Sequence, residues 1–147
     1  MGAMTDTNDT DPVVQLTEDE SLELMATNSL GRLVVRRKDD MDLFPLNFVV
    51  DGERIVFRTA EGSKLFSLTL NDDVLFETDF ADFETGEAWS VIVKGRARAL
   101  ISTEDIRKAD ELPLHPWLPT LKYNYVEIRP ESISGRRFHL GEEPERY

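Results

Sequence analysis

Residues 44–59 read FPLNFVVDGERIVFRT, a pattern that predicts two β-strands joined by a tight turn. The segments Phe44–Val50 and Ile55–Thr59 are rich in aromatic and β-branched side chains, which favour strands. The dipeptide Asp51-Gly52 between them is typical of a hairpin turn. Pro45 has no backbone N–H, so we expect it at an edge or bulge of the sheet. The stretch therefore predicts an antiparallel hairpin.

The strand that ends at Thr59 runs into a short turn whose residues suit a phosphate group. Thr59 and Ser63 carry hydroxyls, Gly62 permits close approach of the backbone, and Lys64 adds a positive charge. The alternative interpretation is an ordinary turn in which Ser63 caps a helix and Lys64 points into water. Strand alternation puts Thr59 and Arg58 on opposite faces, so we do not expect both to reach a phosphate from one surface.

The rest of the chain predicts more strands and a few short helices. Thr17 and Glu20 form a capping box that starts a helix, which we expect to end near Leu30, before Gly31. Gly95 marks a bulge or barrel corner within a long strand. The further strands expected are 33–35, 74–78, 90–100 and, as the last, 123–128, beyond which residues 133–138 follow Pro130; short helices are expected over 64–70 and from Thr103. At least six mostly antiparallel strands predict a mainly β protein, a barrel with small helices outside.

Length and composition indicate one globular domain. The chain has 147 residues, of which 40% are hydrophobic and 31% charged. We expect an acidic, disordered N-terminus over residues 1–11, one domain over 12–140 and a frayed tail over 141–147. We interpret Met1–Ala3 as the remnant of an expression tag, with Met4 as the natural start. No apolar run is long enough for a membrane span and no secretory signal precedes the domain, so we expect a cytoplasmic protein.

Charge and residue types exclude several classes of function. The net charge of −12 argues against nucleic-acid binding, because phosphate backbones would be repelled. With no cysteine, disulfides, thiolate metal sites and cysteine nucleophiles are excluded. The carboxylates lack the spacing of a metal-binding loop, so we expect no metal. An acidic run over residues 72–87 and a basic run over 32–38 are interpreted as solvated loops.

In order and spacing, five blocks resemble the FMN-binding split barrels related to pyridoxamine 5′-phosphate oxidase, across nearly all of the chain from Leu16 to Phe138. The blocks are 29–33 (SLGRL), 44–50 (FPLNFVV), 55–64 (IVFRTAEGSK), 89–97 (WSVIVKGRA) and 133–138 (ISGRRF). The resemblance implies a split β-barrel and a homodimer with the cofactor site at the subunit interface.

Carried over position by position, the resemblance implies a flavin site. The flavin phosphate would lie against residues 58–64 and the ring along residues 45–48, with the partner chain contributing Trp89 and Ser90. The cofactor-binding residues implied are Pro45, Leu46, Asn47, Phe57, Arg58, Thr59, Gly62, Ser63, Lys64, Trp89, Ser90, Arg136 and Phe138. Asn47 could equally be a satisfied polar residue of the sheet, and Trp89 a core aromatic. One of Arg136 and Arg137 is expected to face the ligand and the other to pair with a surface carboxylate.

Departures from the family pattern narrow the function. Residues 133–138 contain no histidine, and residues 44–50 lack the arginine-then-lysine pattern of true pyridoxamine-phosphate oxidases. His115 and His139 lie in a connection and a tail, and we expect neither to act as acid, base or haem ligand. We therefore expect an FMN-dependent oxidoreductase acting on a small organic substrate, with a deazaflavin or, in some branches, haem as alternative cofactors. Two alternatives belong to other functional classes: a non-catalytic protein that stores or senses flavin, and a dimer that binds no cofactor and serves interaction alone.

Overall fold

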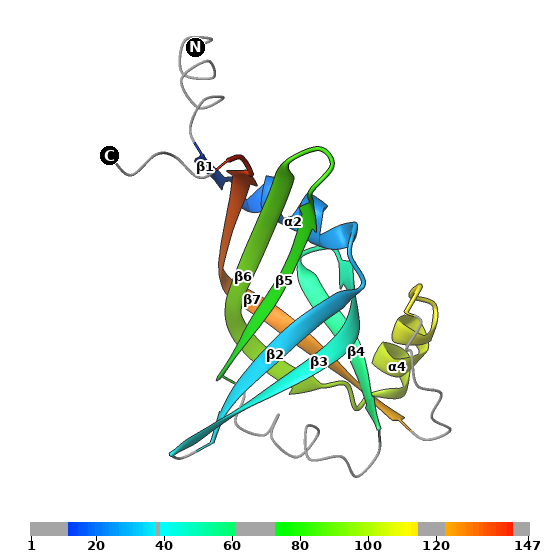
Figure 1. Cartoon of the computed structure of the whole chain (residues 1–147). Helices are drawn as coiled ribbons and strands as arrows, with labels where there is room; N and C mark the ends of the chain where they lie inside the picture. Colours follow the sequence, from blue (N-terminus) through cyan, green and yellow to red (C-terminus); the bar gives the residue numbers. More distant parts are fainter. Residues whose placement is uncertain (1–11, 38, 61–72, 115–122, 143–147) are drawn as a thin grey trace.

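The computed structural model describes residues 12–37, 39–60, 73–114 and 123–142. Seven antiparallel strands form one sheet in the order β1-β7-β4-β3-β2-β5-β6, and a further pairing of β7 with β6 closes it into a barrel (Figure 1). The strands are β1 (Val13–Leu16), β2 (Leu30–Arg37), β3 (Asp40–Asp51), β4 (Arg54–Ala60), β5 (Asp73–Asp82), β6 (Glu87–Ala99) and β7 (Tyr123–His139). The predicted mainly β barrel is confirmed. No helix in the described ranges is long and apolar enough to cross a membrane.

The barrel is split where β3 and β4 diverge. Their pairing is recorded from Phe48 to Asp51 against Arg54 to Phe57, which confirms the predicted hairpin. Earlier in β3, Pro45 pairs with Arg32 of β2 and lies before this β3–β4 pairing begins. Pro45 lacks a backbone N–H, and it is tolerated here because this part of β3 has no recorded pairing with β4. This agrees with the expectation that Pro45 lies at an edge of the sheet.

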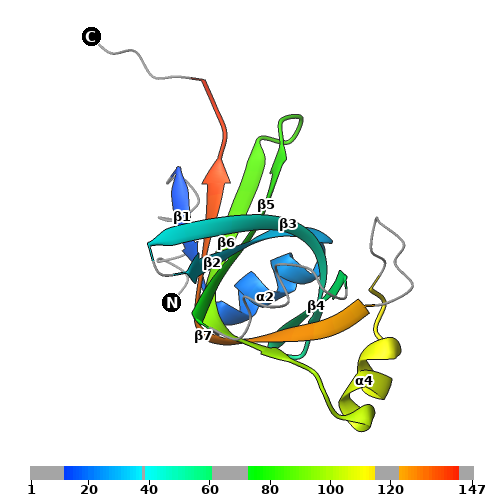
Figure 2. The ribbon, with the colours of Figure 1, turned by 90° about the horizontal axis from the view of Figure 1, so that it is seen from below.

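Helix α2 (Glu18–Ala26) lies across one end of the barrel (Figure 2). Its capping box is present, because Thr17 N donates to Glu20 Oε1 at 2.9 Å and Glu20 N donates to Thr17 Oγ1 at 3.1 Å. The first of these bonds is the main reason why the pKa of Glu20 is lowered. The predicted end near Leu30 was wrong: the helix stops at Ala26 with Thr27 as its C-cap, and Leu30 already pairs with Asn47 of β3.

Two hydrophobic clusters lie on the two sides of β4. The main core fills the barrel, with fully buried side chains such as Phe57 and Phe76. Phe48 meets Phe76 edge to face, with 4.9 Å between ring centroids. The second cluster lies between the sheet and helix α4 (Thr103–Asp110), and it includes Val56 and Tyr125. Strand β4 is therefore covered on both faces, which explains its nearly continuous run of apolar residues.

Several sequence-based boundaries need correction. The acidic and basic runs were predicted to be loops, but their described residues lie mostly in strands β5 and β2, with charges on the outer face and apolar residues inside. The last strand was predicted to end near Ile128, but β7 continues through Pro130 to His139, beside the register shift in β6. Val13–Leu16, which was not among the predicted strands, forms β1 against the end of β7. The predicted helix over 64–70, the N-terminal segment 1–11 and residues 143–147 of the tail lie outside the described residues.

The bulge expected at Gly95 is present, as a register shift between Lys94 and Gly95 in the β6–β7 ladder. A Cβ at Gly95 would overlap the backbone carbonyl oxygen of Arg129. Because backbone of a paired strand cannot easily move aside, Gly95→Ala is expected to lower the free energy of unfolding by about 1–3 kcal/mol. Urea denaturation measures it, with Gly141→Ala as control, since a Cβ there meets nothing within 4 Å. Equal effects of the two substitutions would contradict this packing.

Candidate functional site

The outer face of the sheet brings together four of the implied flavin-site residues. Pro45 lies in a cross-strand row with Arg32, Glu77 and Ile92, which runs from β3 through β2 and β5 to β6. On the next row, Asp79 pairs with Ser90, which pairs with Arg136, while Asn47 pairs with Leu30. Because side chains alternate along a strand, Pro45, Asn47, Ser90 and Arg136 share the outer face. The intervening residues Leu46 and Trp89 pack against the core instead.

A small ion-pair cluster occupies the middle of this outer face. Arg32 Nη1 lies 2.7 Å from Glu77 Oε1 and 3.7 Å from Asp79 Oδ2. Beside it, Asn28 Nδ2 donates to the hydroxyl of buried Thr78 at 2.8 Å, which ties the end of α2 to β5. Burial raises the pKa of Glu77 to about 7, helped by the neighbouring Asp79 and opposed by Arg32. No sequence pattern predicts this cluster, because Arg32 and Glu77 are far apart in the chain.

The raised pKa of Glu77 predicts a pH dependence of stability. Its carboxyl has a pKa of about 7 when folded and an ordinary value of 4.5, so between these the folded state binds more protons than the unfolded state. Stability contributed by this group is therefore full below about pH 4.5 and is lost as the pH rises towards 7. Urea denaturation between these pH values should show this fall, and Glu77→Gln should flatten it. Glu84→Gln, in the turn of the β5–β6 hairpin, is the charge-matched control; a flattening of the same size there would refute the assignment.

Arg58 and Thr59 lie on opposite faces of β4, as strand alternation predicted. Thr59 is buried, with 6% of its surface exposed. The Arg58 guanidinium carbon lies 3.7 Å from the centroid of the Tyr123 ring, and its Nε is buried without a hydrogen-bond partner in the described part of the chain. Gly62, Ser63 and Lys64 lie outside the described residues. Of the implied phosphate contacts, the structure thus places Arg58 and Thr59 at the end of β4 and on different surfaces.

Asn47 also has a structural role. Its side-chain Nδ2 donates to the carbonyl oxygen of Ser29 at 3.1 Å, which fastens β3 to the segment between α2 and β2. Phe57 is fully buried in the main core. Both positions were implied as flavin contacts, and in the structure their side chains serve the fold; Asn47 retains its place on the outer face beside Pro45.

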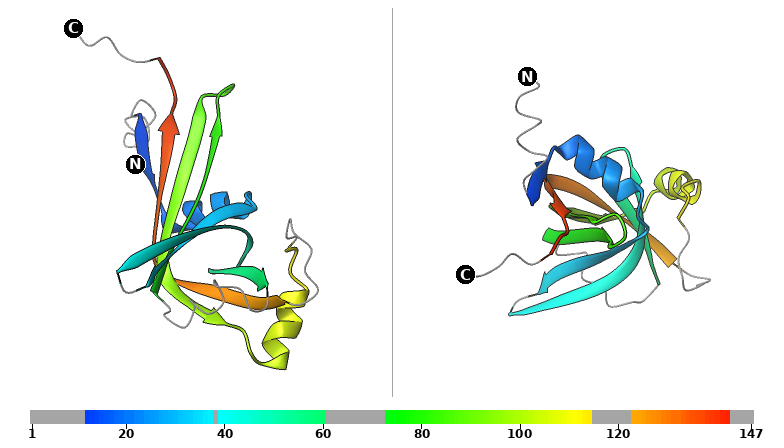
Figure 3. Two further views of the ribbon diagram at one scale, coloured as in Figure 1. Left: turned by 60° about the horizontal axis from the view of Figure 1, so that its bottom comes forward. Right: turned by 45° about the horizontal axis from the view of Figure 1, so that its top comes forward.

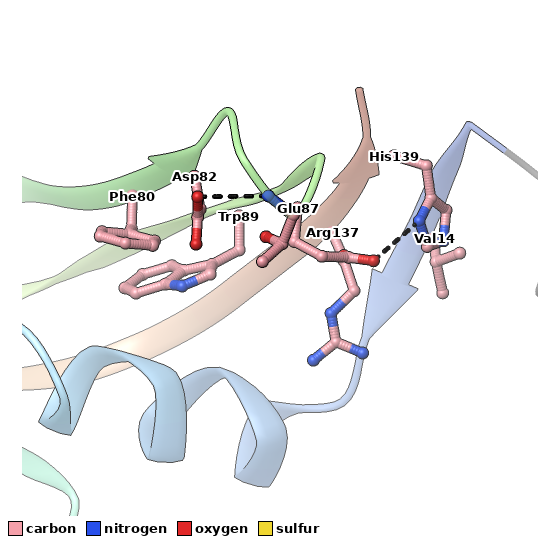
Figure 4. Close-up of a pocket in the computed structure, with 8 residues that line it drawn as sticks. Val14, Phe80, Asp82, Glu87, Trp89, Arg137 and His139 are labelled. Atoms are coloured by element: carbon pink, nitrogen blue, oxygen red, sulfur yellow. Dashed lines mark hydrogen bonds and ion pairs between the residues drawn. The ribbon is translucent and has the colours of Figure 1, made fainter. Parts of the chain in front are cut away.

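The β5–β6 hairpin and the end of β7 extend beyond the barrel (Figure 3). A pocket of about 400 Å³ lies between them (Figure 4). Glu87 Oε1 lies 3.1 Å from His139 Nδ1, while Glu87 Oε2 is buried without a hydrogen-bond partner among the described residues. His139 is the last residue of β7, and its side chain pairs with the Glu87 carboxylate. The prediction that His139 lies in a tail was wrong. The pocket is lined by Val14, Phe80, Asp82, Thr85, Glu87, Trp89, Arg137 and His139.

The register of β7 separates the two neighbouring arginines. Arg137 pairs with Trp89 and lines the pocket, whereas Arg136 pairs with Ser90 on the outer face. Phe138 pairs with Ala88 and Val13, on the same side as Arg136. His115, the other histidine of the chain, lies outside the described residues. The alternation of side chains along a strand is enough to place Arg136 and Arg137 on opposite faces of β7. The pairing of β7 with β6 is needed to show that Arg137 faces the pocket and Arg136 the outer face.

The fold is a split barrel, a single antiparallel sheet that the β6–β7 pairing closes, with α2 across one end and β3 paired to β4 over only part of its length. The family model for pyridoxamine 5′-phosphate oxidase matches residues 17–137. The chain therefore belongs to the pyridoxamine 5′-phosphate oxidase family.

Three relatives illustrate the range of similarity. A structure from Corynebacterium glutamicum, provisionally described as a pyridoxamine 5′-phosphate oxidase, is 56% identical, covers 90% of this chain and 98% of its own, and superposes with a TM-score of 0.84. The FAD binding protein from Mycobacterium smegmatis is 41% identical, covers 85% of this chain and 99% of its own, and has a TM-score of 0.75. The uncharacterised protein Rv3129 of Mycobacterium tuberculosis is 46% identical over 67% of this chain and 87% of its own length.

Proposed function

We propose that this chain binds FMN at the interface of a homodimer and acts as a flavin-dependent oxidoreductase on a small organic substrate. The observation that carries the proposal is the outer face, where Pro45, Asn47, Ser90 and Arg136 lie on one surface although they are distant in sequence. The relative from M. smegmatis described as an FAD binding protein supports a flavin in general. FMN and FAD share the ring and its first phosphate, so one site suits either.

The end of β4 fits an anionic group of such a cofactor. The buried Arg58 Nε has no acceptor among the described residues, whereas Thr59, one residue further along the strand, lies on the opposite face. A phosphate on the Arg58 side of this strand end would supply an acceptor to Arg58 Nε. The bound flavin would supply hydride or electron transfer, and the protein would bind and orient it. In this arrangement Pro45 and Asn47 would border the ring, and the Arg32–Glu77–Asp79 cluster would hold a proton beside it.

The same outer face supports the dimer. Large apolar side chains are exposed there: Met41 is 69% exposed, Leu43 57% and Ile92 37%. Leu43 lies in a row with Val34 and Leu75, and these two residues, with Met41, line a groove of about 270 Å³. Several large apolar side chains exposed on one face, around an ion-pair cluster, are typical of a protein interface. A second copy of the chain would cover this face and complete the cofactor site from both sides.

The absorption spectrum of the purified protein tests the proposed cofactor. We expect flavin absorbance as isolated, or its appearance as bound cofactor after incubation with FMN. Binding of FAD or a deazaflavin in preference to FMN would move the assignment to that cofactor, and no binding of any of them would refute the function. Anaerobic mixing with a reduced nicotinamide then separates the two classes: bleaching of bound flavin supports an oxidoreductase, whereas its absence favours storage or sensing.

Lys64→Ala tests the phosphate contact predicted from the sequence. Loss of a charge-assisted hydrogen bond should weaken FMN binding by about 1–3 kcal/mol and leave riboflavin binding nearly unchanged. Isothermal titration with both ligands measures this, and Lys108→Ala, on the exposed side of α4, is the control. Equal weakening of FMN and riboflavin by Lys64→Ala would contradict a phosphate contact.

A further inference from the structure

A second cluster of charges lies on the outer face of β7, away from the proposed flavin site. Glu127 is 1% exposed and accepts hydrogen bonds from three arginines on three strands. Arg54 Nη1 donates to Oε2 at 2.7 Å, and Arg98 donates to Oε1 through Nη2 at 2.7 Å and Nε at 3.0 Å. Arg129 Nε donates to the same Oε1 at 3.0 Å. Because a carboxylate has about four acceptor sites, Glu127 is saturated.

The arginines have more donor groups than Glu127 can use. Arg54 directs its other nitrogens to Asp51, at 2.8 and 3.1 Å, so its fork is fully engaged. Arg98 Nη1 and both terminal nitrogens of Arg129 have no acceptor in the described part of the chain. These two side chains are 52% and 71% exposed. Both guanidinium groups donate to the same oxygen, Glu127 Oε1, at 3.0 Å or less, and both side chains are largely open to water.

The charge of this cluster stands out against the rest of the protein. The chain carries a net charge of −12, whereas here three guanidinium groups balance the carboxylates of Glu127, Asp51 and Glu53. Burial opposes ionisation of Glu127, but the hydrogen bonds from Arg54 and Arg98 outweigh it, so its pKa is lowered and the carboxylate stays charged. Like charges held this close repel one another, and an anion that bridged the open sides of Arg98 and Arg129 would relieve this repulsion.

Next to the cluster is a cavity large enough for a small molecule. It has a volume of about 340 Å³ and is lined by Asp51, Glu53, Arg54, Arg129 and Pro130. Sites for small ligands usually begin at about 300 Å³. Arg129 belongs to both features, so an anionic group held by its guanidinium could have the rest of its molecule in the cavity. The carboxylates of Asp51 and Glu53, which also line the cavity, would accept hydrogen bonds from hydroxyl or amino groups of that molecule.

We propose that Arg98 and Arg129, positioned by Glu127, bind the phosphate group of a small phosphorylated molecule whose hydroxyl or amino groups face Asp51 and Glu53. A phosphate group has three terminal acceptor oxygens and can accept from both guanidinium groups at once, whereas a carboxylate has only two. The site is separate from the proposed flavin site. Arg54 and Thr59 lie at opposite ends of β4, five residues and thus roughly 16 Å apart along the strand.

Titration of the protein with inorganic phosphate, followed through the side-chain Nε–Hε resonances of arginine in NMR spectra, tests the site. We expect saturable shifts of the Arg98 and Arg129 signals, with little change at Arg107 on α4, which pairs with Glu104 and Glu111. Acetate at equal ionic strength should bind at least about tenfold more weakly, a difference of about 1.4 kcal/mol. Arg129→Gln should weaken phosphate binding at least about tenfold, and Arg107→Gln should not change it.

Each outcome decides for or against the site. The wild-type titration needs no variant, and the mostly exposed Arg129 can be replaced while Arg54 and Arg98 still hold Glu127. Shifts spread equally over all arginines, equal binding of acetate, or no saturable shift would overturn the proposal and leave the cluster with a structural role. A response that disappears in Lys64→Ala and is kept in Arg129→Gln would assign phosphate to the flavin site instead. If the protein bound no flavin, the shifts expected for Arg98 and Arg129 on phosphate titration would be the same, because this site does not depend on the flavin site.

Discussion

Glu127→Gln is expected to lower the free energy of unfolding by about 3 kcal/mol, the largest effect on stability among the proposed substitutions. Removing one partner of a buried ion pair typically costs about 3–5 kcal/mol, because the remaining charge stays buried. We expect the lower end of this range, since Arg98 and Arg129 are half exposed or more and can turn towards water. Arg54, whose side chain is 26% exposed, cannot do so as easily. Urea denaturation at fixed protein concentration measures the change.

The matched control is Glu104→Gln. Glu104 pairs with Arg107 at 2.9 Å, but both side chains are largely exposed. Exposed ion pairs contribute about 0–1 kcal/mol, so this substitution should change stability little. If Glu127→Gln destabilised the protein no more than Glu104→Gln, Glu127 would not be the centre of a buried network. The chemical change is the same in both variants, so the difference between them isolates the effect of burial.

Ile92→Glu is expected to have the largest effect on assembly and cofactor binding. Ile92 lies on the outer face directly across from Glu77, so a carboxylate at position 92 would add an unpaired charge and a like-charge neighbour to the proposed interface. We expect the dimer dissociation constant to rise at least about 100-fold, which corresponds to about 2.7 kcal/mol. FMN affinity should fall with it, because the proposed site needs both subunits. Sedimentation equilibrium and FMN titration at several protein concentrations measure the two effects.

Ile101→Glu is the control for this substitution. Ile101 is 83% exposed and lies between β6 and α4, outside the rows that form the outer face. The substitution Ile101→Glu makes the same chemical change on another surface. The dimer dissociation constant and the affinity for FMN should therefore stay as in the wild type. A monomeric Ile92→Glu protein that still bound FMN with unchanged affinity would contradict a cofactor site shared between subunits, while leaving flavin binding itself intact.

The fold was largely predictable because its signals are local. The hairpin of β3 and β4 follows from the alternation around Asp51-Gly52, and the start of α2 follows from Thr17 and Glu20. Local signals failed where tertiary pairing decides. The charges of β5 resemble those of a loop because its outward residues are acidic, and Pro130 resembles a strand end although it sits beside the bulge at Gly95. Neither feature can be recognised without the partner strand.

The site was predictable only in part. Alternation along β4 is enough to separate Arg58 from Thr59, and the two side chains do lie on different surfaces. The register of β6 with β7 was needed to show that Ser90 and Arg136 face one side while Trp89 and Arg137 face the other. The two charge clusters join residues from different strands and leave no pattern in the sequence, since each member looks like an ordinary surface charge on its own strand.

Sedimentation velocity with simultaneous detection at a protein and a flavin wavelength tests the proposed shared flavin site most directly. After incubation with FMN and removal of free ligand, we expect flavin absorbance to move with a species of twice the chain mass, with one flavin per chain. Flavin that sediments with a monomer would contradict the shared site. Flavin that does not sediment with the protein at all would contradict the proposed function.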